Sequence, residues 1–146
     1  MSENRQKVSN HVLAITVGLV YLWFGVLKFF QSASPAEDLA KSTIELLTFG
    51  LIPSNVSIIL LATWETLLGL LLMINVFRRP VIVVAMVHTA FTFSPLFLFP
   101  ELSFSNPPFS FTFLGQYVFK NIIMMGALVV LYNQSRQYQT KQLHNR

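Results

Sequence analysis

Four long stretches of apolar residues divide the chain. They cover about residues 12–30, 56–76, 81–99 and 114–132. Each has close to the roughly 20 residues with which a helix crosses the ~30 Å hydrocarbon layer of a bilayer. A membrane-spanning strand would need about half that length and would alternate apolar with polar residues, which these stretches do not do. The pattern therefore predicts four transmembrane helices.

A weaker pattern lies between the first and second stretches. Ser34 to Glu37 has the form of a capping box with proline at the first helical position. Small and apolar residues then recur at helical spacing, opposite a polar face, until Gly50 and Pro53 end the pattern. We therefore expect a short amphipathic helix over about residues 35–48, lying on the outer surface of the membrane.

The connection between the third and fourth stretches carries a different signal. Pro107 and Pro108 prevent a helix from continuing there. Phe109, Phe111 and Phe113 follow in alternation. This favours an extended segment whose aromatic rings lie at the level of the lipid headgroups.

Composition supports a lipid environment for a single domain covering residues 1–146. The chain is 53% hydrophobic and only 11% charged, whereas a soluble domain has about 25% charged residues. It has no cysteine, which excludes disulfides, thiolate metal sites and dithiol redox chemistry. The net charge of +4 comes from cations at the ends of apolar stretches, a pattern that indicates membrane orientation and no nucleic-acid partner.

The distribution of cations predicts the orientation in the membrane. Lysine and arginine gather at the N-terminus, in the second connection and in the tail of about residues 133–146, whereas the first and third connections together hold only Lys41. Because positive loops face the cytoplasm, we expect both termini to be cytoplasmic in a plasma or inner membrane. The predicted fold is thus an antiparallel, all-α, four-helix transmembrane bundle with a short amphipathic helix in its first outer loop.

Four ionisable residues lie in or at the ends of the predicted spans, where charge is costly and needs a reason. They are Lys28, Glu65, His88 and Lys120. At about 1.5 Å of rise per residue, Glu65 lies roughly 13 Å and Lys120 roughly 9 Å below the outer ends of their helices. We therefore predict that these two side chains face the interior within salt-bridge reach of each other, directly or through one bridging group, and that Lys28 reaches toward them. Two lysines beside one glutamate leave a surplus cation, which requires an anion, a carbonyl-bearing ligand or water.

Each of these residues also has a purely structural interpretation. A buried Glu–Lys pair can serve only to fix the order of the helices. Lys28 can extend to the headgroups, and His88 can be a hydrogen-bonded core residue. No His, Asp and Glu cluster has metal-ligand spacing, and we identify no catalytic motif or phosphate loop. We expect no metal site and no enzyme activity by the chain alone.

Several segments resemble the DoxX-like family of small four-helix membrane proteins. The first helix contains Tyr21-Leu-Trp-Phe-Gly-Val-Leu-Lys28, and the second contains Glu65-Thr-Leu-Leu-Gly. The third ends in His88-Thr-Ala-Phe-Thr-Phe-Ser-Pro, and the fourth begins Gly-Gln-Tyr-Val-Phe-Lys120-Asn. The resemblance covers nearly the whole chain in order, and it implies the same four site residues as the charge argument. The supporting residues predicted from helix faces, aromatic positions and this resemblance are Tyr21, Trp23, Trp64, Thr92, Gln116, Tyr117 and Asn121.

The resemblance implies association with membrane oxidoreductases, and three functions remain open. The first is an accessory subunit or quinone-interacting component of such a system, with no intrinsic cofactor; Trp23, Trp64, His88 and Lys120 are the residues expected to receive a quinone. The second is a non-catalytic factor that assembles or stabilises a partner membrane complex. The third is a small binder or carrier of an organic anion. The expected partners are lipid, a membrane oxidoreductase or other membrane protein, and a second copy of the chain.

Overall fold

The computed structural model describes residues 2–30, 34, 36–76, 78–107 and 109–144. Its helices and strands are α1 (Ser2–Leu27), α2 (Glu37–Leu47), α3 (Ser54–Ile74), α4 (Arg78–Phe91), α5 (Pro95–Leu98), α6 (Pro100–Ser103), β1 (Phe104–Asn106), β2 (Ser110–Phe111), α7 (Phe113–Phe119) and α8 (Asn121–His144). Within the described residues, four helical segments are long and apolar enough to cross a membrane: Val8–Leu27, Ser54–Ile74, Arg78–Leu98 and Phe113–Arg136. The prediction of an all-α protein with four membrane-length helices is confirmed.

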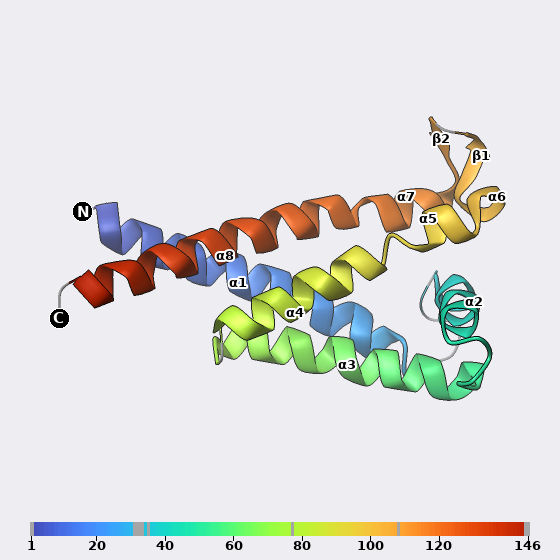
Figure 1. Cartoon of the computed structure of the whole chain (residues 1–146), viewed down its shortest axis with the longest axis horizontal. Coiled ribbons are helices and arrows are strands. Elements are labelled where there is room, and N and C mark those ends of the chain that lie inside the picture. Colours follow the sequence, from blue (N-terminus) through green and yellow to red (C-terminus); the bar gives the residue numbers. More distant parts are fainter. Residues whose placement is uncertain (1, 31–33, 35, 77, 108, 145–146) are drawn as a thin grey trace.

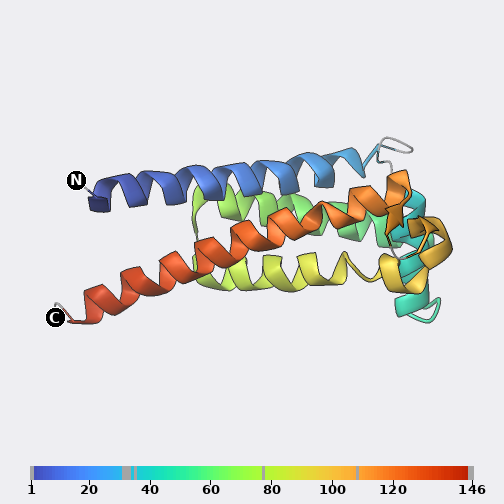
Figure 2. The same ribbon diagram turned by 90° about the horizontal axis from the view of Figure 1, so that it is seen from above.

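The long helices alternate in direction along the bundle. In Figure 1 and Figure 2, α1, α3, α4 and the α7–α8 pair each run opposite to the one before, so both termini lie at one end. The opposite end carries α2, α5, α6 and the β1–β2 hairpin, and is called the loop end below. Connections that are short relative to the helices make sequential helices neighbours.

Helices α1 and α3 lie unusually close together. A Cβ atom placed on Gly69 of α3 would lie 2.5 Å from the backbone nitrogen of Leu22. One placed on Gly25 of α1 would lie 2.6 Å from the backbone nitrogen of Thr66. Only glycine permits this approach, which is how small residues bring membrane helices into contact. The two backbones therefore touch along the same face that carries Glu65.

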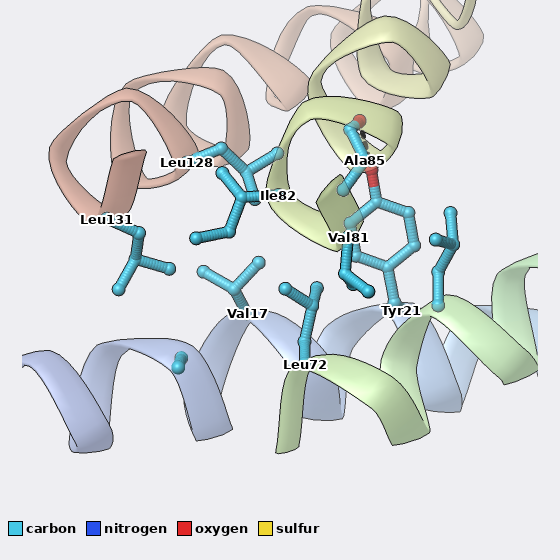
Figure 3. Packing of buried hydrophobic residues seen from close by; sticks show 10 residues of the cluster. Val17, Tyr21, Leu72, Val81, Ile82, Ala85, Leu128 and Leu131 are labelled. Carbon is cyan, nitrogen blue, oxygen red and sulfur yellow. Dashed lines mark hydrogen bonds between the residues drawn. The ribbon is translucent and has the colours of Figure 1, made fainter. Parts of the chain in front are cut away.

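The apolar core lies where the long helices meet. Its side chains come from α1, α3, α4 and α8, and Figure 3 shows Val17, Leu72 and Ile82 packed among Leu128 and Leu131. Many large apolar side chains on the outer faces of these helices stay exposed in the isolated chain. A soluble protein of this size would bury more of them, so a lipid bilayer is the environment that these apolar helices indicate.

The helix boundaries differ from the predicted ones in two informative places. The helix predicted over 81–99 is interrupted after Phe91, where Phe93 and Ser94 form only tight turns, because Pro95 has no backbone N–H with which to continue the helix. The helix predicted over 114–132 has a break at Lys120 and then continues to His144, so most of the predicted tail is helical.

The first helix also has different ends from those predicted. Helix α1 begins at Ser2 and stops at Leu27, whereas the prediction was 12–30. Lys28 follows in a turn in which its backbone N–H bonds to the carbonyl of Gly25 over 3.2 Å. The lysine is therefore placed just past the helix end, where its side chain can turn toward α3.

Helix α2 occupies most of the segment predicted to be helical. The predicted capping box is wrong: α2 has Ala36 as its N-cap, with no side-chain cap in the described chain, and Pro35 lies outside the described residues. The Glu37 carboxylate accepts a hydrogen bond from Lys41, one turn later in α2, over 2.6 Å. Leu39 and Thr43 of α2 are buried.

The connection before the fourth helix forms a small hairpin. Strands β1 and β2 are antiparallel, and Phe104 pairs with Phe111 across them with ring centroids 4.9 Å apart. Phe109, in the segment predicted to be extended, lies in the turn with its side chain 92% exposed, and Pro108 is outside the described residues.

Candidate functional site

A cavity of about 230 Å³ lies inside the bundle near the loop end. Its walls come from α1, α3, α4 and the α7–α8 pair, and the apolar face of α2 closes one side. Most of the lining is apolar. The polar residues that line it are Tyr21, Lys28, Ser34, Thr43, Glu65, His88, Thr89, Thr92, Ser94, Tyr117, Lys120 and Asn121. All four predicted site residues thus face one cavity.

The carboxylate of Glu65 is bonded on both oxygens. Lys28 Nζ donates to Oε2 over 2.5 Å, and His88 Nε2 lies 3.3 Å from Oε1. The side chains of Lys28 and Glu65 are each only 9% exposed. Lys28 also donates to the backbone carbonyl of Phe24 over 3.3 Å. Such a pair neutralises two charges that would be costly to bury singly.

Of the two predicted arrangements of Glu65 and Lys120, the direct ion pair is wrong, although both side chains line the cavity in the interior of the bundle. Within the described residues the carboxylate is bonded to Lys28 and His88, and no ion pair joins it to Lys120. The reason is the close approach of α1 and α3 at Gly25. Lys28 follows that contact by three residues, so its ammonium reaches the Glu65 carboxylate directly.

Lys120 lies between two aromatic rings. Its Nζ is 4.1 Å from the centroid of the Phe24 ring and 3.8 Å from that of Tyr117, and the two rings meet edge to face at 5.5 Å. Each ring face attracts a cation. An ammonium has three N–H donors, and a ring face satisfies them far less well than the oxygen of a water molecule does. Within the described residues, the ammonium of Lys120 forms no hydrogen bond. The Lys120 side chain lines the cavity.

A chain of hydroxyl groups connects the helices beside the charged residues. Tyr21 donates to the carbonyl of Ala85 over 2.9 Å, as Figure 3 shows, and shares a 2.6 Å hydrogen bond with Thr89. Just past the end of α4, Asn121 donates to the hydroxyl of Thr92 over 2.9 Å. These bonds fix α1 and α8 against α4, so the polar wall of the cavity is built on a connected framework.

Both helix breaks lie at the cavity. Thr92, Ser94 and Pro95 at the α4–α5 break, and Lys120 and Asn121 at the α7–α8 break, all line it. Irregular backbone at membrane depth is tolerated where it is buried in protein or lines a cavity. Pro95 was the sequence signal for the first break, and the prediction of one continuous helix overlooked it.

Three predicted supporting residues lie outside the cavity lining. Trp23 is 63% exposed and Trp64 is 45% exposed. Gln116 is also exposed and donates to the backbone carbonyl of Phe111 over 3.5 Å. At about 100° per residue, Trp23 lies roughly 200° around α1 from Tyr21, and Trp64 roughly 100° around α3 from Glu65. Neither indole therefore shares the helix face of the polar wall, and neither lines the cavity.

Several lining residues were not predicted as part of the site, and two of them, Phe24 and Ser34, lie beside its polar groups. Phe24 lies three residues after Tyr21 and four before Lys28, so helical spacing could have identified it. Ser34 lies in the loop before α2 and had no such signal.

Neither a metal-binding group among the described residues nor a match to a known protein indicates what the site binds. The described residues contain no group of three or more His, Cys, Asp and Glu side chains able to hold a metal ion. No family model, curated protein or solved structure matches the chain. The arrangement itself offers a mostly apolar chamber with a neutralised carboxylate on one wall and an ammonium between two rings on another.

Proposed function

We propose that the protein is a DoxX-like membrane protein that binds the head ring of a quinone, as an accessory component of a membrane oxidoreductase system. The observation that best supports this proposal is the cavity, which combines apolar walls with a few converging polar groups at the breaks of two helices. That combination is typical of small-molecule sites.

The size of the cavity favours a ring without a long tail. An apolar cavity of about 150 Å³ holds benzene in a protein core. The volume of about 230 Å³ found here therefore has room for one ring with its substituents. An isoprenoid tail would have to leave the cavity toward lipid.

The polar groups match the oxygens of such a ring. The ammonium of Lys120 can donate to a quinone carbonyl, and Asn121 has a second amide N–H besides the one bonded to Thr92. The ammonium of Lys28 and the carboxylate of Glu65 are already bonded to each other. In the proposal this pair shapes the polar wall, and Lys120 receives the ligand.

A binder of an organic anion is the second candidate, and the position of Lys120 favours it. The cavity lining holds two lysines and one carboxylate, and Glu65 is already bonded to Lys28. The surplus ammonium would attract an anionic ligand as well as a carbonyl oxygen, and the anion more strongly.

Titration with duroquinone, a single-ring quinone without a tail, tests the proposal. The protein is placed in lipid nanodiscs, and isothermal titration calorimetry measures the heat released when duroquinone is added. The same titration into empty nanodiscs is the blank. Saturable binding is expected for the natural chain. Ala40→Phe should abolish it, because residue 40 lines the cavity, whereas Ala90→Phe, on an exposed face of α4, should not.

Two results would contradict the proposal. Binding that survives in the Ala40→Phe protein would place duroquinone elsewhere. Absence of binding, together with a partner membrane protein that copurifies with the natural chain, would favour the assembly role instead.

A further inference from the structure

Among the residues that the structure describes, the ammonium of Lys120 has no anionic partner, whereas that of Lys28 has one. Lys28 is bonded to Glu65 over 2.5 Å, and the second oxygen of Glu65 faces His88. Lys120 contacts the faces of Phe24 and Tyr117, and no described residue bonds its Nζ. Two ring faces stabilise the charge, but they provide no oxygen or nitrogen acceptor for its N–H donors, and the side chain lines the cavity.

A buried polar group, the hydroxyl of Ser34, also lines the cavity without a normal hydrogen bond. Ser34 is only 5% exposed, and its Oγ is buried. This hydroxyl lies near that of Tyr117 but forms no hydrogen bond of normal length and angle with any described residue. A buried hydroxyl is usually bonded, so an unbonded one beside a cavity indicates a ligand atom that accepts from it.

We propose that the ligand carries an oxyanion on its ring, either a phenolate or an ionised ring hydroxyl of a quinone, bonded by Lys120 with the Ser34 and Tyr117 hydroxyls beside it. This inference rests on the proposed function and adds the charge state of the ligand. The surplus positive charge then meets its counter-ion on the ligand, and both unsatisfied groups gain a partner. The attraction between the opposite charges of the ammonium and the oxyanion adds to this hydrogen bond, whereas a bond to a neutral carbonyl oxygen lacks it.

A pair of probes with the same ring separates charge from shape. Para-nitrophenolate is an oxyanion, and para-nitroanisole is its neutral methyl ether. Equilibrium dialysis measures how tightly each probe binds to the protein in nanodiscs, with empty nanodiscs as the blank. The pH is kept above the pKa of free nitrophenol. The natural chain should bind the phenolate at least about tenfold more tightly than the anisole, which is the effect of one charge-assisted hydrogen bond.

Variants assign the preference to one lysine. Lys120→Met should remove the preference for the phenolate, whereas Lys120→Arg, which keeps the charge, should retain most of it. Lys41→Met is the matched control, since Lys41 is bonded to Glu37 and lies outside the cavity lining. The visible absorption band of bound phenolate should also persist to lower pH with the natural chain than with Lys120→Met, a signature that altered folding would not produce.

The outcomes distinguish this inference from the proposed function. Equal binding of phenolate and anisole by the natural chain, or an unchanged preference in a folded Lys120→Met protein, overturns the oxyanion. Duroquinone binding would still support the proposed function in that case. If no ring compound binds, both fail.

Discussion

The ion pair between Lys28 and Glu65 should be the strongest pairwise interaction between the polar side chains of the bundle. Both side chains are 9% exposed, and their charged atoms lie 2.5 Å apart. Removing one partner of a buried pair costs about 3–5 kcal/mol in soluble proteins. Interhelical hydrogen bonds in a membrane protein average about 0.6 kcal/mol and reach about 1.7. Because this pair carries full charges and excludes most solvent, we expect a coupling energy of about 1–2 kcal/mol.

A double-mutant cycle measures this coupling directly. Lys28→Met and Glu65→Gln each remove one charge at nearly constant volume, and the double variant removes both. Unfolding of all four proteins by SDS in mixed micelles, followed by far-UV circular dichroism, gives the free energies. Lys28→Met should be the more harmful single change, because Glu65 lies deep in α3, whereas a lone Lys28 sits past the end of α1 and keeps the Phe24 carbonyl.

A second cycle serves as the control. Glu65→Gln combined with Lys120→Met should be additive within about 0.5 kcal/mol, as for residues that do not share a bond. Additive losses in the first cycle would refute the Lys28–Glu65 pairing seen in the structure. A larger coupling in the second cycle would support the Glu65–Lys120 pairing predicted from depth.

Three further predictions concern packing, hydrogen bonding and orientation. Gly69→Ala should cost about 1–3 kcal/mol by forcing α1 away, whereas Gly126→Ala, whose Cβ would meet nothing within 4 Å, should be neutral or slightly stabilising in the same SDS assay. Tyr21→Phe should cost about 1 kcal/mol there, because two hydrogen bonds to α4 are lost. Since the chain has no cysteine, Ser42→Cys and Asn133→Cys provide unique labelling sites. In intact cells an impermeant maleimide should label only Ser42→Cys, and labelling of Asn133→Cys alone would reverse the proposed orientation.

The polar wall of the cavity was predictable as a set of residues. Lys28, Glu65, His88 and Lys120 are conspicuous because ionisable groups are rare in apolar stretches, and all four line one cavity. Their pairing was not predictable from depth along the helices. Depth gives one coordinate, whereas an ion pair also depends on how far each helix is rotated and how closely it approaches its neighbour.

The aromatic part of the site shows the same limit. Tyr117 was identified from its helix face and Phe24 was missed, yet together they hold the ammonium of Lys120. Trp23 and Trp64 were attractive as large rings near the charged residues, but helix rotation directs them outward. Residue type suggests a stacking surface, and only the packed helices decide which rings face inward.

The sequence by itself determined the class of this protein and the number of its membrane-length helices. Lipid requires each spanning segment to satisfy its own backbone, so length and apolar content are enough to locate the spans. The tertiary structure decided the breaks beside Pro95 and at Lys120, the cover formed by α2, and the partner of Glu65. These features depend on contacts between segments far apart in the sequence, above all the approach of α1 to α3, which no local pattern records.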